Sequence, residues 1–167
     1  ITEDEALTDE VTSLVEMPNI LIGNFEDKYL SIPEECLTLT MKTNQKYFPV
    51  FNRNTGLTNS FIIVSNISPK NSDQVIHGNE KVIRPRLADA EFFYDEDKKL
   101  GLTTFCKKLE NVIYHHKLGS QKDRAERVAH KLLYLTKNLN LKFNIDPMAL
   151  SLFSKADLLS LMVGEFP

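Results

Sequence analysis

Tryptophan is absent from this 167-residue chain, and cysteine and glycine are scarce, with two and six residues. Cys36 and Cys106 do not have the spacing of a metal site, and we interpret them as small hydrophobic residues. A disulfide between them is not expected if the compartment is cytosolic. The few glycines form no phosphate-cradling loop, so we do not expect an ATP site within this chain.

Long hydrophobic runs are also missing. No apolar run approaches the roughly 20 residues of a transmembrane helix, and no basic-then-apolar signal peptide opens the chain. We therefore expect no membrane partner and a cytoplasmic protein. The chain starts with Ile1 rather than Met and ends at Pro167, just after an apolar helical pattern, so we interpret it as an internal fragment of a longer protein.

Acidic residues are concentrated at one end of the chain. Residues 1–36 contain ten acidic residues and a single base, Lys28, although the whole chain has a net charge of only −3. Residues 37–167 are correspondingly basic. This asymmetry has two explanations: solvated helix faces, or a basic body toward which an anionic partner is steered.

The first half of the sequence predicts a mixture of helices and strands. Residues 3–17 are expected to form an amphipathic helix, capped by Thr2, with Leu7, Val11, Leu14 and Val15 on one face. Residues 19–25 are a candidate strand, and Pro33 marks the start of a helix.

A β-hairpin is predicted next, from apolar runs at 46–51 and 60–66 around the turn-forming residues 52–56. Pro49 cannot donate to a ladder, so its strand should lie at an edge or carry a bulge. The second run is apolar throughout, so we expect a central strand covered on both faces.

After Pro69 the pattern becomes helical. One long helix, or two joined at Pro85, should reach the charged residues 95–99, which are the best candidate for a domain boundary. Beyond them, helices are predicted over about 102–117 and 122–138, with a pair after Pro147. The expected fold class is α+β, with an α+β part over 1–97 and an all-helical part over 98–167.

Five basic residues are candidates for contact with nucleic-acid phosphates. Arginine is suited to phosphate by its planar fork of donors, and basic residues on one surface can follow a backbone. The candidates are Lys81, Arg84, Arg86, Lys42 and Lys46. Internal ion pairs, with Asp89 or Glu91, are an equal explanation.

Catalytic and metal-binding patterns are weak. His115 and His116 are adjacent, so on a helix they would project about 100° apart and would not readily face one metal. His77 and His130 have no evident partner in the sequence. No Gly-x-Ser-x-Gly motif occurs, and neither cysteine has a predicted histidine neighbour, so we assign no catalytic residue and no metal ligand.

One family does match, on segments that follow each other in a fixed order. Residues 41–95, and above all the run from Asn79 to Phe93, closely resemble the β subunit of the bacterial two-subunit glycyl-tRNA synthetase. Three shorter segments resemble the same family: Leu14–Pro18, Lys117–Ser120 and Ser154–Leu158. The resemblance therefore covers nearly the whole chain.

The resemblance implies a domain similar to the B3/B4 module of phenylalanyl-tRNA synthetase, followed by a truncated helical domain similar to HD phosphohydrolases. Those hydrolases hold a metal with a His-Asp pair, and here Ala156 takes the histidine position beside Asp157. Alanine has no ligand atom, so the resemblance argues for the fold and against hydrolysis. Asp157 is expected to cap or pair locally instead.

In this family the α subunit activates glycine with ATP and magnesium, and the β subunit chiefly binds tRNA. The implied partners are the α subunit, in a heterotetramer, and the tRNA for glycine, with no DNA. The fragment would supply scaffold and RNA-facing surface and would be inactive alone. The alternatives are an editing-type or HD-type hydrolase, and a structural module for subunit assembly.

Overall fold

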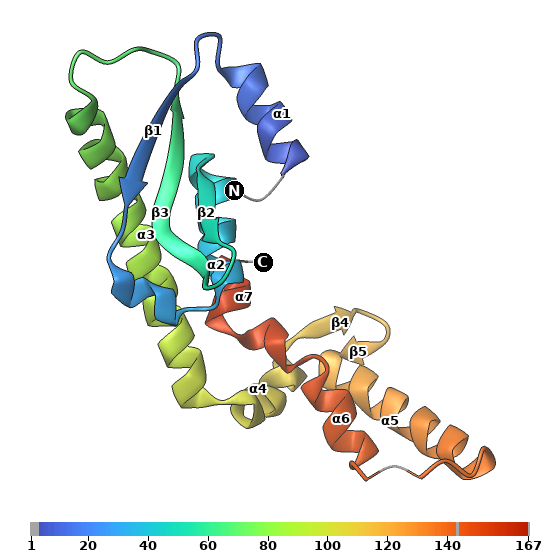
Figure 1. Ribbon diagram of the computed structural model, residues 1–167. Coiled ribbons are helices and arrows are strands. Elements are labelled where there is room, and N and C mark those ends of the chain that lie inside the picture. Colours follow the sequence, from blue (N-terminus) through green and yellow to red (C-terminus); the bar gives the residue numbers. More distant parts are fainter. Residues whose placement is uncertain (1–3, 143, 167) are drawn as a thin grey trace. The chain divides into compact units, whose positions relative to one another are not determined.

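The computed structural model describes residues 4–142 and 144–166. Its fold is α+β and mostly helical, with small antiparallel sheets (Figure 1). Compact packing divides the chain into two units between Phe92 and Phe93, inside one helix. The assignment of 1–97 and 98–167 to a B3/B4-like and an HD-like domain stays a prediction.

The first unit begins with helix α1 (Glu5–Leu14). The predicted cap, Thr2, lies outside the described residues, and the helix is capped by Asp4, whose carboxylate accepts from the Leu7 N–H at 3.0 Å. Leu7 and Val11 are buried as predicted, but Leu14 is 61% exposed because the helix ends there.

A three-stranded antiparallel sheet follows, in the order β1-β3-β2. Strand β1 (Asn19–Asn24) is confirmed, as is the hairpin of β2 (Phe48–Asn52) and β3 (Gly56–Ser65). Pro49 lies in an edge strand next to a register shift, as its missing N–H predicts. Strand β3 is central, but its residues are alternately buried and half-buried, so the sheet is not fully covered on both faces.

Short helical segments connect β1 to β2: η1 (Asp27–Ser31), α2 (Glu34–Leu39) and the π-helical η2 (Thr40–Asn44). They bury Leu37 and Met41 completely. Tyr47, just before β2, stacks on Phe61 of β3 with ring centroids 4.8 Å apart. The core of this unit therefore forms around the ring of Phe61, which is also fully buried.

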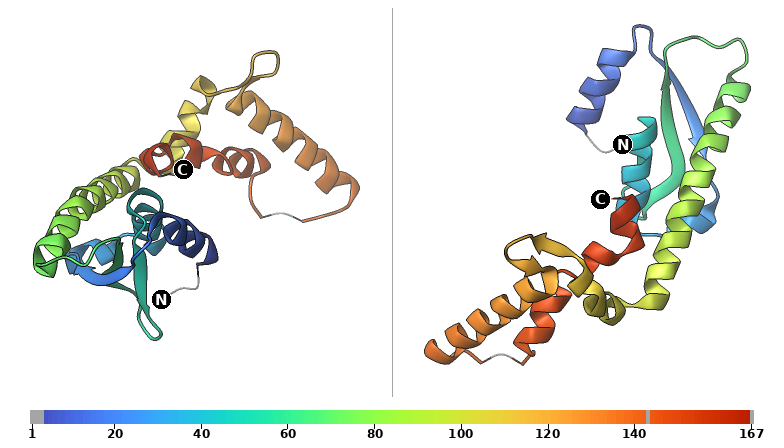
Figure 2. Two further views of the ribbon diagram at one scale, coloured as in Figure 1. Left: turned by 90° about the horizontal axis from the view of Figure 1, so that it is seen from above. Right: turned by 180° about the vertical axis from the view of Figure 1, so that it is seen from behind.

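Helix α3 (Ser72–Leu100) passes through Pro85 without a break. Its first part runs along the sheet of the first unit (Figure 2), and it buries Ile83, Leu87 and Ala90. Proline has no N–H for the carbonyl four residues earlier, that of Lys81. Both residues are exposed, so water can bind the freed carbonyl. The helix also continues through residues 95–99, where the sequence predicted a boundary.

The second unit contains α4 (Leu102–Lys108), η3 (Leu109–Asn111), α5 (Gln121–Asn138), α6 (Pro147–Phe153), η4 (Ala156–Leu159) and α7 (Leu161–Glu165). Helix α5 and the pair after Pro147 are as predicted, and α5 packs beside α6 (Figure 2). Asp97 accepts from the N–H groups of Leu161 and Met162, both at 2.9 Å, so the charged stretch caps α7.

The prediction that this part is all-helical was wrong. Strands β4 (Ile113–His115) and β5 (Gly119–Ser120) form a small hairpin where the helix 102–117 was expected. Ile113 and Tyr114 have the β-branched and aromatic side chains that favour strands. Gly119 has a φ of 85°, which lets the chain turn back.

Candidate nucleic-acid interface

Lys42 and Lys46 are held by carboxylates at the start of the chain. Lys42, in η2, lies 2.7 Å from the Asp4 carboxylate, and Lys46 lies 2.7 Å from that of Glu10 in α1. The hydrogen bond from Lys42, with that from the Leu7 N–H, lowers the pKa of Asp4. Both lysines therefore already have an anionic partner within the fold.

Arg84 also has a partner, though not a predicted one. Its Nε donates to Glu26 Oε1 at 2.6 Å, across 58 residues of sequence. The pKa of Glu26 is lowered by its own backbone N–H and by Arg84. Glu91, one of the expected partners, binds Lys28 at 3.0 Å instead. The predicted pairing with Asp89 or Glu91 was therefore wrong in its partners, although internal pairing itself occurs.

Lys81 and Arg86 differ from the other three candidates. Both are exposed, and neither forms an ion pair with any residue in the described parts of the chain. Five residues along a helix advance by about 140°, so the two side chains leave α3 in different directions. Arg84 and Arg86 are about 200° apart by the same geometry. The structure therefore does not gather the five cations into one patch.

His115 and His116 are adjacent in the second unit, and His77 belongs to the first unit. His115 ends strand β4 rather than lying on a helix, and its Nδ1 accepts from the Lys117 N–H at 3.1 Å. His77 Nδ1 lies 3.8 Å from Glu80. Within residues 4–142 and 144–166, no group of three or more His, Cys, Asp or Glu could hold a metal ion.

Ala156 and Asp157 open the short helix η4. Ala156 is completely buried, so a larger side chain there would need space that the core does not provide. The Asp157 backbone carbonyl accepts from the N–H and hydroxyl of Ser160, so the residue bonds locally through its main chain.

The two cysteines are free and half-buried. Burial raises the pKa of each thiol, Cys36 in α2 and Cys106 in α4. A raised pKa disfavours the thiolate, which is the reactive form.

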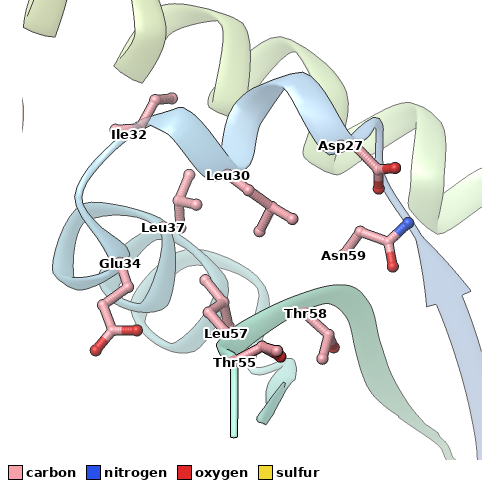
Figure 3. A pocket seen from close by; sticks show the side chains of 9 residues that line it. All are labelled: Asp27, Leu30, Ile32, Glu34, Leu37, Thr55, Leu57, Thr58 and Asn59. Carbon is pink, nitrogen blue, oxygen red and sulfur yellow. The ribbon is translucent and has the colours of Figure 1, made fainter. Parts of the chain in front are cut away.

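A pocket of about 640 Å³ lies in the first unit (Figure 3). Apolar side chains of Leu30, Leu37 and Leu57 line it between Asp27 at one end and Glu34 at the other. Two carboxylates favour a cation and disfavour a phosphate. Sequence reasoning missed this pocket because its walls come from η1, α2 and the hairpin, which no local pattern connects.

Sequence reasoning also missed the carboxylates that neutralise the candidate cations. Asp4, Glu10 and Glu26 lie tens of residues from their partners, and only the acidic composition of residues 1–36 hinted at them. Three of the five candidates are thus internally paired, and two remain available to a phosphate.

None of the helices in the described parts of the chain combines the length and apolar character needed to cross a bilayer.

Comparisons with known proteins agree with each other. A family model described as "Glycyl-tRNA synthetase beta subunit" matches residues 1–167. The glycine–tRNA ligase beta subunit of Dechloromonas aromatica (strain RCB) is 52% identical over 168 residues, and that of Janthinobacterium sp. (strain Marseille) is 53% identical over 165. Each alignment covers 99% of this chain but 23% of the relative, so the chain spans less than a quarter of the length of these relatives.

Proposed function

The chain belongs to the glycyl-tRNA synthetase beta-subunit family, and from this premise we propose that it works as part of glycine–tRNA ligase, which joins glycine to its tRNA with ATP. Its partners are the α subunit and the tRNA, in the cytoplasm. ATP and magnesium belong to the α subunit in this proposal. The sequence of this chain contains no glycine-rich phosphate loop, in keeping with this division.

Within the enzyme, this part of the β subunit serves as scaffold and presents cations to the tRNA backbone. One observation carries the second role: Lys81 and Arg86 are exposed on α3 with no ion-pair partner in the described residues. Lys42, Lys46 and Arg84 serve the scaffold, since each already binds a carboxylate. Phosphate contacts add affinity and position the RNA without reading its sequence.

Aminoacylation by the complete enzyme tests this division. Replacing Lys81 and Arg86 together by alanine should raise the KM for tRNA about tenfold or more, as expected for losing two charge-assisted contacts. The kcat and the ATP-dependent activation of glycine should not change, because lost uniform binding acts on KM alone. A reduced rate of glycine activation with an unchanged KM for tRNA would refute the RNA-facing role.

A purely structural module for subunit assembly is the second candidate. The ion pairs of Lys42, Lys46 and Arg84 favour it, because the first two tie η2 and the residues just after it to helix α1 and its cap, and the third ties helix α3 to Glu26. This reading predicts that Lys81 and Arg86 can be replaced with no effect on the KM for tRNA. The same kinetic experiment therefore separates the two candidates.

A further inference from the structure

One turn in the second half of α5 is apolar on every side. Leu132, Leu133, Tyr134 and Leu135 are consecutive, and each residue of a helix advances by about 100°, so four of them surround the axis. A helix that is hydrophobic all round is typical of a buried position. Here, however, Leu133, Tyr134 and Leu135 are 49%, 69% and 50% exposed.

One stripe of this helix, continued by the C-cap residue Leu139, has exposed apolar side chains. Val128, Leu135 and Leu139 are spaced by seven and four residues, so they lie on one face, and they are 47%, 50% and 62% exposed. On the side of α5 that faces α6, Ala125 is buried and, with Val128 and with Ser151 of α6, lines a small cavity of about 130 Å³. Helix α6 therefore borders the stripe at Val128, and all three side chains of the stripe remain exposed.

The chemistry of the stripe selects a protein partner. It offers aliphatic side chains, whereas an RNA backbone requires cations or hydrogen-bond donors. Spacing by seven and four residues is the pattern of a helix that packs lengthwise against a second helix. Interfaces between separately folded subunits mix polar and apolar residues, whereas a helix turn that is apolar all round belongs in a domain core.

The length of the relatives indicates where that partner lies. This chain covers 23% of the first two relatives, so more than three quarters of such a subunit consists of other residues. We propose that the stripe of Val128, Leu135 and Leu139 packs against a helix of the same β subunit that lies outside these 167 residues. This inference rests on membership of the family and is independent of tRNA binding.

Hydrogen exchange in the complete β subunit, measured without the α subunit, tests the proposal on the unmodified protein. Amides of residues 128–139 should exchange on the order of tenfold or more slowly than those of the exposed α1 helix end, and about as slowly as those of residues 83–90 in α3. Rapid exchange over 128–139 in the β subunit alone would overturn the proposal. So would protection that begins only when the α subunit is added, because the α subunit would then be the occupant.

Thiol labelling gives a second, position-specific readout. Leu135→Cys and Leu139→Cys should react on the order of tenfold or more slowly with a water-soluble maleimide in the complete β subunit than the controls Arg127→Cys and Lys137→Cys. The controls lie on the same helix outside the stripe, and mass spectrometry of the peptides distinguishes these sites from Cys36 and Cys106. Equal labelling of stripe and control positions would contradict the proposal.

Discussion

Gly23 occupies a position in β1 that only the smallest residue fits. A Cβ added there would lie 2.6 Å from the ring of Phe61, which is completely buried. We predict that Gly23→Ala lowers the free energy of unfolding by about 1–3 kcal/mol, through displacement of the ring. Urea denaturation measures this change.

Gly78 supplies the matched control. It lies within α3, and nothing is within 4 Å of an added Cβ. Gly78→Ala should therefore stabilise the protein by about 0.5–1 kcal/mol, because glycine is a poor residue for a helix interior. If Gly23→Ala and Gly78→Ala change the free energy of unfolding by the same amount, the close packing of the Phe61 ring against Gly23 is contradicted.

Tyr47 connects the sheet to α3 and is sensitive to alkaline pH. Its hydroxyl donates to Asn79 Oδ1 at 2.6 Å, and burial raises its pKa to about 12. The pKa of Tyr47 is thus higher in the folded state than its value of about 10 in the unfolded state. The contribution of the neutral Tyr47 hydroxyl to the free energy of unfolding is therefore complete below pH 10 and is lost as the pH rises towards 12.

Tyr47→Phe should therefore have two effects on stability. The free energy of unfolding at neutral pH should fall by about 1 kcal/mol, because Asn79 loses its donor. Between pH 10 and 12 the free energy of unfolding of the variant should fall less steeply with pH than that of the parent protein. Denaturation across this pH range measures both, and Tyr134→Phe, at a side chain 69% exposed, is the control. An unchanged alkaline slope would contradict the burial of the Tyr47 hydroxyl.

At the scale of elements, helix α5 begins with a reciprocal cap. Ser120 Oγ accepts from the Asp123 N–H at 3.2 Å, and the Asp123 carboxylate accepts from the Ser120 N–H at 2.7 Å. The second bond is the main reason that the pKa of Asp123 is lowered. We predict that Ser120→Ala costs about 1 kcal/mol of the free energy of unfolding.

Thr136→Ala is the control for this cap, measured in the same denaturation series. The Thr136 hydroxyl donates to the Leu133 carbonyl within the helix, so its loss should change stability by less than about 0.5 kcal/mol. A loss at Thr136 as large as that at Ser120 would show that hydroxyl removal, rather than capping, determines the effect.

Elements with strong local signals were predictable, and those set by tertiary contacts were not. The hairpin with Pro49 at its edge followed from residues close in sequence, as did α5. The strands β4 and β5 were missed because five residues in all give too short a pattern to compete with the helical spacing around them. The passage of α3 through Pro85 depends on the exposure of the Lys81 carbonyl to water, which the sequence does not show.

The candidate site was predictable in composition only. All five cations could be named from the sequence, but their availability depends on partners such as Glu26, which lies 58 residues from Arg84. No periodicity connects residues so far apart. The family was recognisable because its motifs follow each other over the whole chain, a signal that does not require knowledge of contacts.

At the scale of the molecule, the acidic start of the chain has a structural use. Three of its acidic residues neutralise cations of the basic body: the ion pairs are Asp4–Lys42, Glu10–Lys46 and Glu26–Arg84. These acids therefore remove part of the positive charge that was expected to attract an anionic partner. Of the five candidate cations, Lys81 and Arg86 remain for an RNA partner. We therefore expect phosphate contacts from these two residues and not from Lys42, Lys46 or Arg84.

The salt dependence of tRNA binding tests this account most directly. In the complete enzyme, replacing Lys81 and Arg86 together by alanine should flatten the plot of log affinity against log salt by about one unit of slope per lost contact. Arg84→Ala, the control, should leave the slope unchanged and lower the melting temperature, because it breaks the pair with Glu26. An unchanged slope in the double variant would contradict the RNA-facing role and leave this part of the subunit with a structural role alone.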